Sequence, residues 1–163
     1  MQSSQPIIII LLVANLVATV WFGLNEKPSP VLSQTERTAT HELPSAVNSQ
    51  VRDQLYNQFS KAFNEADYDV LYDMFGPTAK IQVSKEKSTS EFKKLLKYFH
   101  SVKSGGFTHS ELVDTQGNTN IYVLHYAVKL SELSEFGTKG TLRVTVAVQG
   151  SEYQVYGIRL NAG

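Results

Sequence analysis

Few residues of this chain are placed to move a proton. A proton-abstraction site needs a carboxylate or histidine base, together with hydrogen-bond donors that hold the developing oxyanion. His125 is the only titratable base in the middle of a predicted strand, because Glu132 and Glu152 fall at or near strand ends. The other acids of the predicted sheet, Glu111 and Asp114, lie on its first strand. We therefore predict no catalytic residue and expect that the chain is not an enzyme.

Motifs for other chemistries are also missing from the sequence. No nucleophile elbow, phosphate-binding loop or zinc-binding helix motif occurs. Asp67, Asp69 and Asp73 lack the Gly and the distal Glu of a calcium loop, and acids in the first turn of a helix favour its dipole. The chain has no Cys, which excludes disulfides, thiol catalysis and thiolate metal sites. We predict no metal and no cofactor.

The charges of the chain are balanced, with 15 Lys and Arg against 15 Asp and Glu. This balance excludes a global field that would attract nucleic acid. A local basic patch has Lys93, Lys94 and Lys97 on a predicted helix, with flanking Lys80, Lys85, Lys87 and Lys103. No arginine or aromatic interleaving in this patch supports nucleic-acid binding. The patch is either a solvated helix face or a surface for anionic headgroups or an acidic partner. We predict no binding of nucleic acid.

An apolar run begins at Ile7 and ends at Leu24 without any charged residue. A helix of this length is roughly 27 Å long, close to the ~30 Å hydrocarbon core of a lipid bilayer. The segment before the run has no Lys or Arg, and Leu16 is too bulky for a cleavage site after Ala18. We therefore predict an uncleaved transmembrane anchor over residues 1–24, and the alternative is a cleaved signal peptide.

Two further regions follow the anchor. Residues 25–44 are rich in Pro, Ser, Thr and Glu and have no apolar periodicity, which predicts a disordered linker. Residues 45–163 are long enough for one domain with a single core. The sequence thus predicts an anchor, a tether and one folded domain.

The first half of the domain has helical periodicity. An apolar residue recurs every four positions on a predicted helix over 45–65: Val47, Val51, Leu55, Phe59 and Phe63. A second, short helix opens at Asp67 and is stopped by Gly76 and Pro77. Ser88 and Glu91 form a capping box for a third amphipathic helix, which continues through Val102 and ends before Ser104.

The second half alternates with the period of β-strands. Strands are predicted over 107–114, 119–131, 140–149 and 152–160, and the short connections between them indicate an antiparallel meander. Alternation places the more apolar sets on the face that packs against the helices: Tyr122, Leu124, Tyr126, Val128, Leu130, Leu142, Val144, Val146 and Val148. His125, Lys129 and Arg143 then lie on the opposite face, either solvated or used in an interface.

Two stretches carry a family resemblance. FNEADYDVLYDMFGPTAK (63–80) resembles the helix-turn-helix opening of small exported members of the nuclear transport factor 2-like superfamily, and FKKLLKYFHSVKSGGF (92–107) resembles the helix before their sheet. The resemblance covers residues 47–160. It implies an α+β fold, with three helices packed on a curled four-stranded antiparallel sheet in a cone-shaped arrangement. Members of the superfamily include isomerases, hydrolases, ligand binders and assembly domains, so the fold alone does not define a function.

The resemblance also bears on location. Lys27 after the span slightly favours a cytoplasmic domain by the positive-inside rule. Membrane-anchored members, including an assembly component of type IV secretion systems, instead imply a single-pass protein of a bacterial-type inner membrane. Their domain lies outside the cytoplasm, in the periplasm or extracellular space. We expect this second arrangement.

Two functional hypotheses follow. The first is a membrane-tethered, non-catalytic binding or assembly domain, which contacts a protein partner or another copy of itself through the basic patch or through His125, Lys129 and Arg143. The alternative is a pocket that binds or converts a small apolar molecule. Its lining would be aromatic: Phe59, Phe63, Tyr72, Phe99, Tyr122 and Tyr126.

Overall fold

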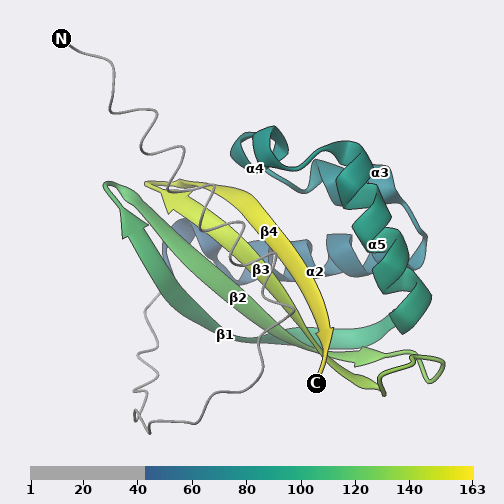
Figure 1. Ribbon diagram of the computed structural model, residues 1–163. Coiled ribbons are helices and arrows are strands. Elements are labelled where there is room, and N and C mark those ends of the chain that lie inside the picture. Colours follow the sequence, from purple (N-terminus) through teal and green to yellow (C-terminus); the bar gives the residue numbers. More distant parts are fainter. Residues whose placement is uncertain (1–42) are drawn as a thin grey trace, which may run out of the picture. The chain divides into compact units, whose positions relative to one another are not determined.

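The computed structural model describes residues 43–163, which form an α+β fold (Figure 1). A short 3₁₀ helix, η1 (Ser45–Val47), precedes four α-helices: α2 (Ser49–Asn64), α3 (Tyr68–Asp73), α4 (Pro77–Gln82) and α5 (Lys85–Phe99). Four strands follow: β1 (Val102–Gln116), β2 (Thr119–Leu130), β3 (Lys139–Gln149) and β4 (Glu152–Ala162). The predicted anchor and nearly all of the predicted linker lie outside the described residues.

The strands form one antiparallel sheet in the order β1-β2-β3-β4, which confirms the predicted meander. Gly150 begins the two-residue turn between β3 and β4 with a φ of 61°, a conformation that glycine adopts without strain. The predicted alternation is also confirmed, because Leu142, Val144 and Val146 are fully buried on the face toward the helices. We call this the inner face and the opposite one the outer face.

The helices cover the inner face of the sheet (Figure 1). Asn48 caps α2 by accepting a hydrogen bond from the Val51 N–H at 3.0 Å. The predicted apolar stripe of α2 is confirmed at its centre, since Leu55, Phe59 and Phe63 are buried against the sheet. Burying a side chain of this size contributes about 1.5–3 kcal/mol, so this stripe is a main source of domain stability.

The second helix stops before Gly76 and Pro77 as predicted, because α3 ends at Asp73. The prediction of three helices was wrong in missing α4, which begins at Pro77, since a proline at the first helical position has no N–H to leave unpaired. The start of the third predicted helix was also wrong. The N-cap of α5 is Ser84, whose Oγ accepts from the Lys87 N–H at 3.3 Å. Ser88 therefore lies inside the helix and is fully buried, so the predicted capping box does not exist.

The beginning of β1 also differs from the prediction. The third helix ends at Phe99, and Val102 is the first residue of β1 rather than the last of the helix. The Asn64 side chain holds this position, because its Nδ2 donates to the Val102 carbonyl and its Oδ1 accepts from the Val102 N–H, each at 2.8 Å. Gly105 continues the strand where a Cβ would lie 2.6 Å from the Ala127 carbonyl oxygen. Glycine here permits close packing and does not mark a loop.

Both edges of the sheet deviate from a regular ladder. The β1–β2 pairing shifts register at three places, between Val102 and Ser104, between Phe107 and His109, and between Leu112 and Asp114. On the other edge, the Gly76 N–H donates to the Val155 carbonyl of β4 at 2.9 Å. The β-bulges on β1 and the hydrogen bond from Gly76 to β4 leave less regular edge backbone available for pairing with a strand of another chain.

Candidate functional site

The six aromatic residues predicted to line a pocket lie in or at the core. Five of them are buried, and Tyr72 is partly buried: Phe59, Phe63, Tyr72, Phe99, Tyr122 and Tyr126. Phe59 stacks on Phe63 with ring centroids 5.4 Å apart, and it also contacts the Phe92 ring at 6.4 Å. These ring contacts are typical of core residues, and they stabilise the packing of the helices against the sheet.

Tyr126 is committed to a structural contact. Its hydroxyl donates a hydrogen bond to the Arg52 carbonyl at 3.0 Å, and its ring stacks on Tyr56 at 5.9 Å. Burial raises the pKa of the Tyr126 hydroxyl well above its ordinary value. The described residues 43–163 include no buried Asp or Glu. A general base for an isomerase-like reaction is thus not positioned among the core rings.

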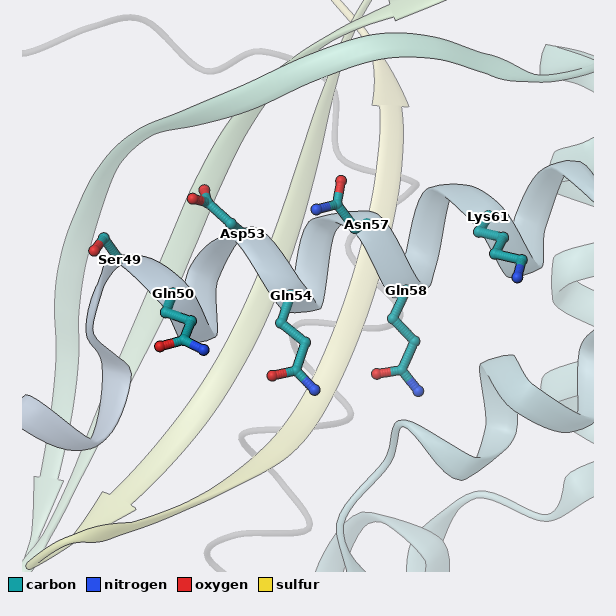
Figure 2. Close-up of a pocket in the computed structure, with 7 residues that line it drawn as sticks. All are labelled: Ser49, Gln50, Asp53, Gln54, Asn57, Gln58 and Lys61. Atoms are coloured by element: carbon teal, nitrogen blue, oxygen red, sulfur yellow. The ribbon is translucent and has the colours of Figure 1, made fainter.

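Two surface hollows of the described region are relevant to the pocket hypothesis. One follows the polar side of α2, as Figure 2 shows, and is lined by Ser49, Gln50, Asp53, Gln54, Asn57, Gln58 and Lys61. The other has a volume of about 290 Å³ and lies between α2, the α3–α4 corner and β4. None of the six predicted pocket rings lines either hollow.

The lysines of α5 are partly neutralised by their neighbours. Lys94 Nζ lies 2.8 Å from Glu91 Oε1, and Lys93 Nζ lies 5.5 Å from the centre of the Tyr68 ring. Lys97 is exposed on the same helix. Lysines near this patch pair with the acids of α3, since Lys80 lies 3.1 Å from Asp73 and Lys85 lies 3.0 Å from Asp69. Of the three patch lysines on α5, Lys94 is therefore offset by the Glu91 carboxylate.

The α3 acids thus have structural partners. Asp67 caps α3, its Oδ1 accepting from the Val70 N–H at 3.1 Å. No group of three His, Asp or Glu residues that could hold a metal ion is found in the described part of the chain. Asp69 lies in the first turn of α3, as predicted, whereas the prediction was wrong for Asp73, which is the last residue of α3 and pairs with Lys80.

A row of basic side chains crosses the outer face of all four strands. The backbone register pairs His109 of β1 with His125 of β2, His125 with Arg143 of β3, and Arg143 with Arg159 of β4. Because neighbouring strands lie ~4.8 Å apart, the four positions span roughly 14 Å. We call these four residues the basic row. It contains two predicted interface residues, His125 and Arg143.

The two histidines of the row are in contact. Their rings stack with centroids 4.2 Å apart and an interplanar angle of 11°. The Thr108 hydroxyl donates to the His125 carbonyl at 3.0 Å and also lies 3.0 Å from His109 Nδ1. A hydroxyl has one proton to donate, so His109 Nδ1 is the donor in the second contact. The pair is therefore fixed by its neighbours.

His125 is buried beside groups of both signs. Glu111 Oε2 lies 3.6 Å from His125 Nε2, a nitrogen without a hydrogen-bond partner. Burial lowers the pKa of the His125 imidazole, the neighbouring His109 and Arg143 lower it further, and Glu111 opposes the shift. Near neutral pH the His125 ring is consequently less charged than an exposed histidine would be.

Lys129 lies on the same face but outside the basic row. It pairs with Lys139 of β3 in the sheet register. Its Nζ lies 3.2 Å from Glu132 Oε1, which offsets its charge. The structure therefore brings His125 and Arg143 together and leaves Lys129 as a separate, paired cation.

Sequence reasoning did not find the two outer members of the row, His109 and Arg159. The β3–β4 turn pairs Gln149 with Glu152, and an unbroken ladder would then pair Arg143 with Ile158. A shift between Thr145 and Val146 of β3 instead pairs Arg143 with Arg159. The break in alternation on β4, where Val155 and Ile158 are both buried, was the available signal of this irregularity.

Comparison with known proteins does not assign this chain to a family. No protein-family model matches the sequence, and no curated protein matches it. Within residues 43–163, none of the helices is sufficiently long and apolar to cross a membrane.

Proposed function

We propose that this chain is a membrane-tethered, non-catalytic binding or assembly domain that acts outside the cytoplasm through contact with another protein. The observation that carries the proposal is the basic row on the outer face of the sheet. Like charges on directly paired strand residues destabilise a sheet, and Arg143 faces Arg159 in this register. A local loss of stability of this kind is typical of residues that are kept for function rather than for folding.

The division of the sheet into two faces supports the proposal. The inner face is covered by the helices and supplies the core, whereas Arg143 and Lys129 of the outer face remain exposed. Binding through the outer face would leave the core undisturbed. The α5 lysines are a weaker candidate surface because Lys94 is paired with Glu91.

The order of elements supports a nuclear transport factor 2-like plan for this domain. Helices that cover one face of a four-stranded antiparallel meander are what the resemblance over residues 47–160 implies. The additional helix α4 is a short element at the predicted end of the second helix. The run between Ile7 and Leu24 would supply the membrane tether.

The alternative of a small-molecule pocket has less support. Its six predicted lining residues contact one another and other core residues, as do Phe59, Phe63 and Phe92. A ligand would have to separate these rings, at the cost of the packing that they provide.

Site-specific photo-cross-linking of the full chain in its membrane tests the proposal. A photoreactive residue replaces Thr141, which pairs with Ala127 and Asn161 beside the basic row and leaves its four side chains intact. The same residue placed at Lys94 probes α5, and at Gln50 it provides a control on the polar side of α2. We expect a cross-linked product from Thr141 that is absent from Gln50. Monomer alone from both Thr141 and Lys94 would contradict the proposal.

The location requires a separate measurement. A topology reporter is fused after Gly163, with one form active only in the cytoplasm and another only outside it. We expect activity of the external reporter. Activity of the cytoplasmic form would overturn the outward orientation and leave the binding proposal to the cross-linking result.

A further inference from the structure

We infer that the basic row, His109, His125, Arg143 and Arg159, is a docking site for an acidic segment of a partner protein. This inference rests on the proposed function, because it names the chemistry that the outer face would recognise. The row continues across every strand of the sheet. An anion placed over it would reduce the repulsion between the paired arginines.

The arginines supply the direct contacts in this site. Arg143 is exposed and Arg159 is half-buried. Arg159 Nε donates to Asn161 Oδ1 at 3.2 Å, which orients its guanidinium group. Planar guanidinium groups bind carboxylates with two parallel hydrogen bonds, and these bonds are stronger than neutral ones. Two adjacent arginines can therefore hold two carboxylates of one segment.

The residues beside the row permit a close approach. Glu111 of β1 and Val123 of β2 pair with each other on the outer face beside the two histidines. The other neighbouring outer-face positions, on β2, β3 and β4, hold small or short polar residues: Ala127, Thr141, Thr145, Gly157 and Asn161. They present little bulk above the sheet, and their hydroxyl and amide groups can bond to the backbone of a docked segment. The row spans roughly 14 Å, which corresponds to about four or five residues of an extended chain.

The geometry favours a protein segment over other anions. The two hollows described above are lined by none of the four residues of the row. The charges of the chain are balanced, with 15 Lys and Arg against 15 Asp and Glu, so no global field attracts nucleic acid to the row. The exposed large apolar residues Ile81, Tyr98, Val113, Leu133 and Phe136 are outside the row, which gives it none of the apolar anchors of a membrane-binding surface.

His125 makes binding depend on pH. The groups that face His125 are Glu111 and His109 on β1 and Arg143 on β3. Protonation of His125 adds positive charge next to Arg143, and a bound carboxylate would favour that protonation. Because the pKa of His125 is lowered by burial, affinity for an acidic segment should rise as the pH falls below about 6.5 toward about 5.5, where glutamate side chains are still ionised.

Fluorescence anisotropy with a labelled glutamate-rich peptide of about ten residues tests the inference. The full chain is held in nanodiscs of uncharged lipid, and a glutamine-rich peptide of equal length is the ligand control. Arg143→Gln with Arg159→Gln removes two charges from the row. Lys93→Gln with Lys94→Gln removes the same two charges from α5 and is the matched protein control. Far-UV circular dichroism checks that both double variants are folded.

We expect the arginine variant to weaken peptide binding by at least about tenfold, and the lysine variant by about twofold or less. His125→Gln should abolish the rise in affinity between about pH 7 and pH 5.5. Equal losses in the two charge variants, or equal binding of the glutamine-rich peptide, would overturn the inference. The inference would also be overturned if a single-stranded oligonucleotide or glycerol phosphate, a soluble lipid headgroup, displaced the labelled peptide more strongly than the unlabelled glutamate-rich peptide does.

The two proposals fail in different ways. A persistent cross-link from Thr141 without binding of the acidic peptide would reject the acidic partner and retain a protein-binding outer face. If no position gave a cross-link but the acidic peptide still bound, the proposed function, contact with a protein partner in the membrane, would be rejected. The basic row would still be able to bind an acidic segment.

Discussion

Replacing Asn64 tests how helix α2 fixes the start of the sheet. The Asn64 amide makes both hydrogen bonds of Val102, at 2.8 Å each, in the manner of a neighbouring strand. Each such bond contributes about 0.5–1.5 kcal/mol net, and the gain in helix propensity on Asn→Ala returns about 0.5 kcal/mol. Asn64→Ala should therefore lower the free energy of unfolding by about 0.5–2.5 kcal/mol. Asn64→Asp should cost at least as much, since a second oxygen would then face the Val102 carbonyl.

Urea unfolding of the full chain in nonionic detergent, followed by circular dichroism, measures this loss. The transition should move to lower urea with an unchanged slope, since the surface exposed on unfolding is the same. In thermal unfolding we expect a decrease in Tm of about 3–8 °C for a domain of this size. A change in the slope would instead indicate that the native or unfolded ensemble had altered.

Asn57 provides the matched control on the same helix. It is exposed on the polar side of α2 (Figure 2), and its carbonyl rather than its side chain accepts from the Ser60 hydroxyl. Asn57→Ala has the same gain in helix propensity and should change the stability by no more than about 0.5 kcal/mol. Equal effects of the two substitutions would refute the role assigned to the Asn64 contacts.

Three further predictions concern buried or tightly packed groups. Ser88→Ala should leave the Tm unchanged or raise it slightly in thermal unfolding, because the buried Ser88 hydroxyl has no hydrogen-bond partner; a decrease would reveal a partner. Gly105→Ala should destabilise the domain by about 1–3 kcal/mol in urea, whereas Gly106→Ala, where a Cβ meets nothing within 4 Å, should be nearly neutral. Because the pKa of His125 is lowered in the folded state, unfolding takes up protons and stability should fall as the pH drops below about 6.5. His125→Gln should reduce this loss in scanning fluorimetry between about pH 7.5 and pH 5, and an unchanged pH dependence would contradict the shift.

The central strands could be predicted because apolar and more polar residues alternate along each strand and so indicate which side chains are buried. Leu142, Val144 and Val146 alternate with more polar residues, so their inward orientation needed no long-range information. Helix α2 could be predicted in the same way, from the apolar residues that recur every four positions along it. Element type thus followed from local periodicity wherever one face was uniformly apolar.

Boundaries and side-chain neighbours depended on contacts between distant segments. Val102 begins a strand because Asn64, 38 residues earlier, binds its backbone. Ser84 caps α5 although Ser88 and Glu91 match a capping box, since both serines are favourable N-cap residues and tertiary burial selects between them. Local sequence preference did not distinguish these alternatives.

The basic row was the least predictable feature. Alternation correctly placed His125 and Arg143 on the outer face. Their neighbours His109 and Arg159 depend on register shifts in the adjacent pairings, each of which displaces the partner by one residue. A one-residue displacement exchanges the two faces of a strand, so the row could not be assembled without knowing where the shifts occur.

The irregular edges of the sheet have a consequence for crowded conditions. Chains that share a flat, regular edge can add to one another strand by strand and form fibrils. Here the three shifts along β1 interrupt one possible template, and the bond from Gly76 to Val155 occupies part of the other. Polymerisation through the edges is consequently disfavoured, even where many copies gather in a small area.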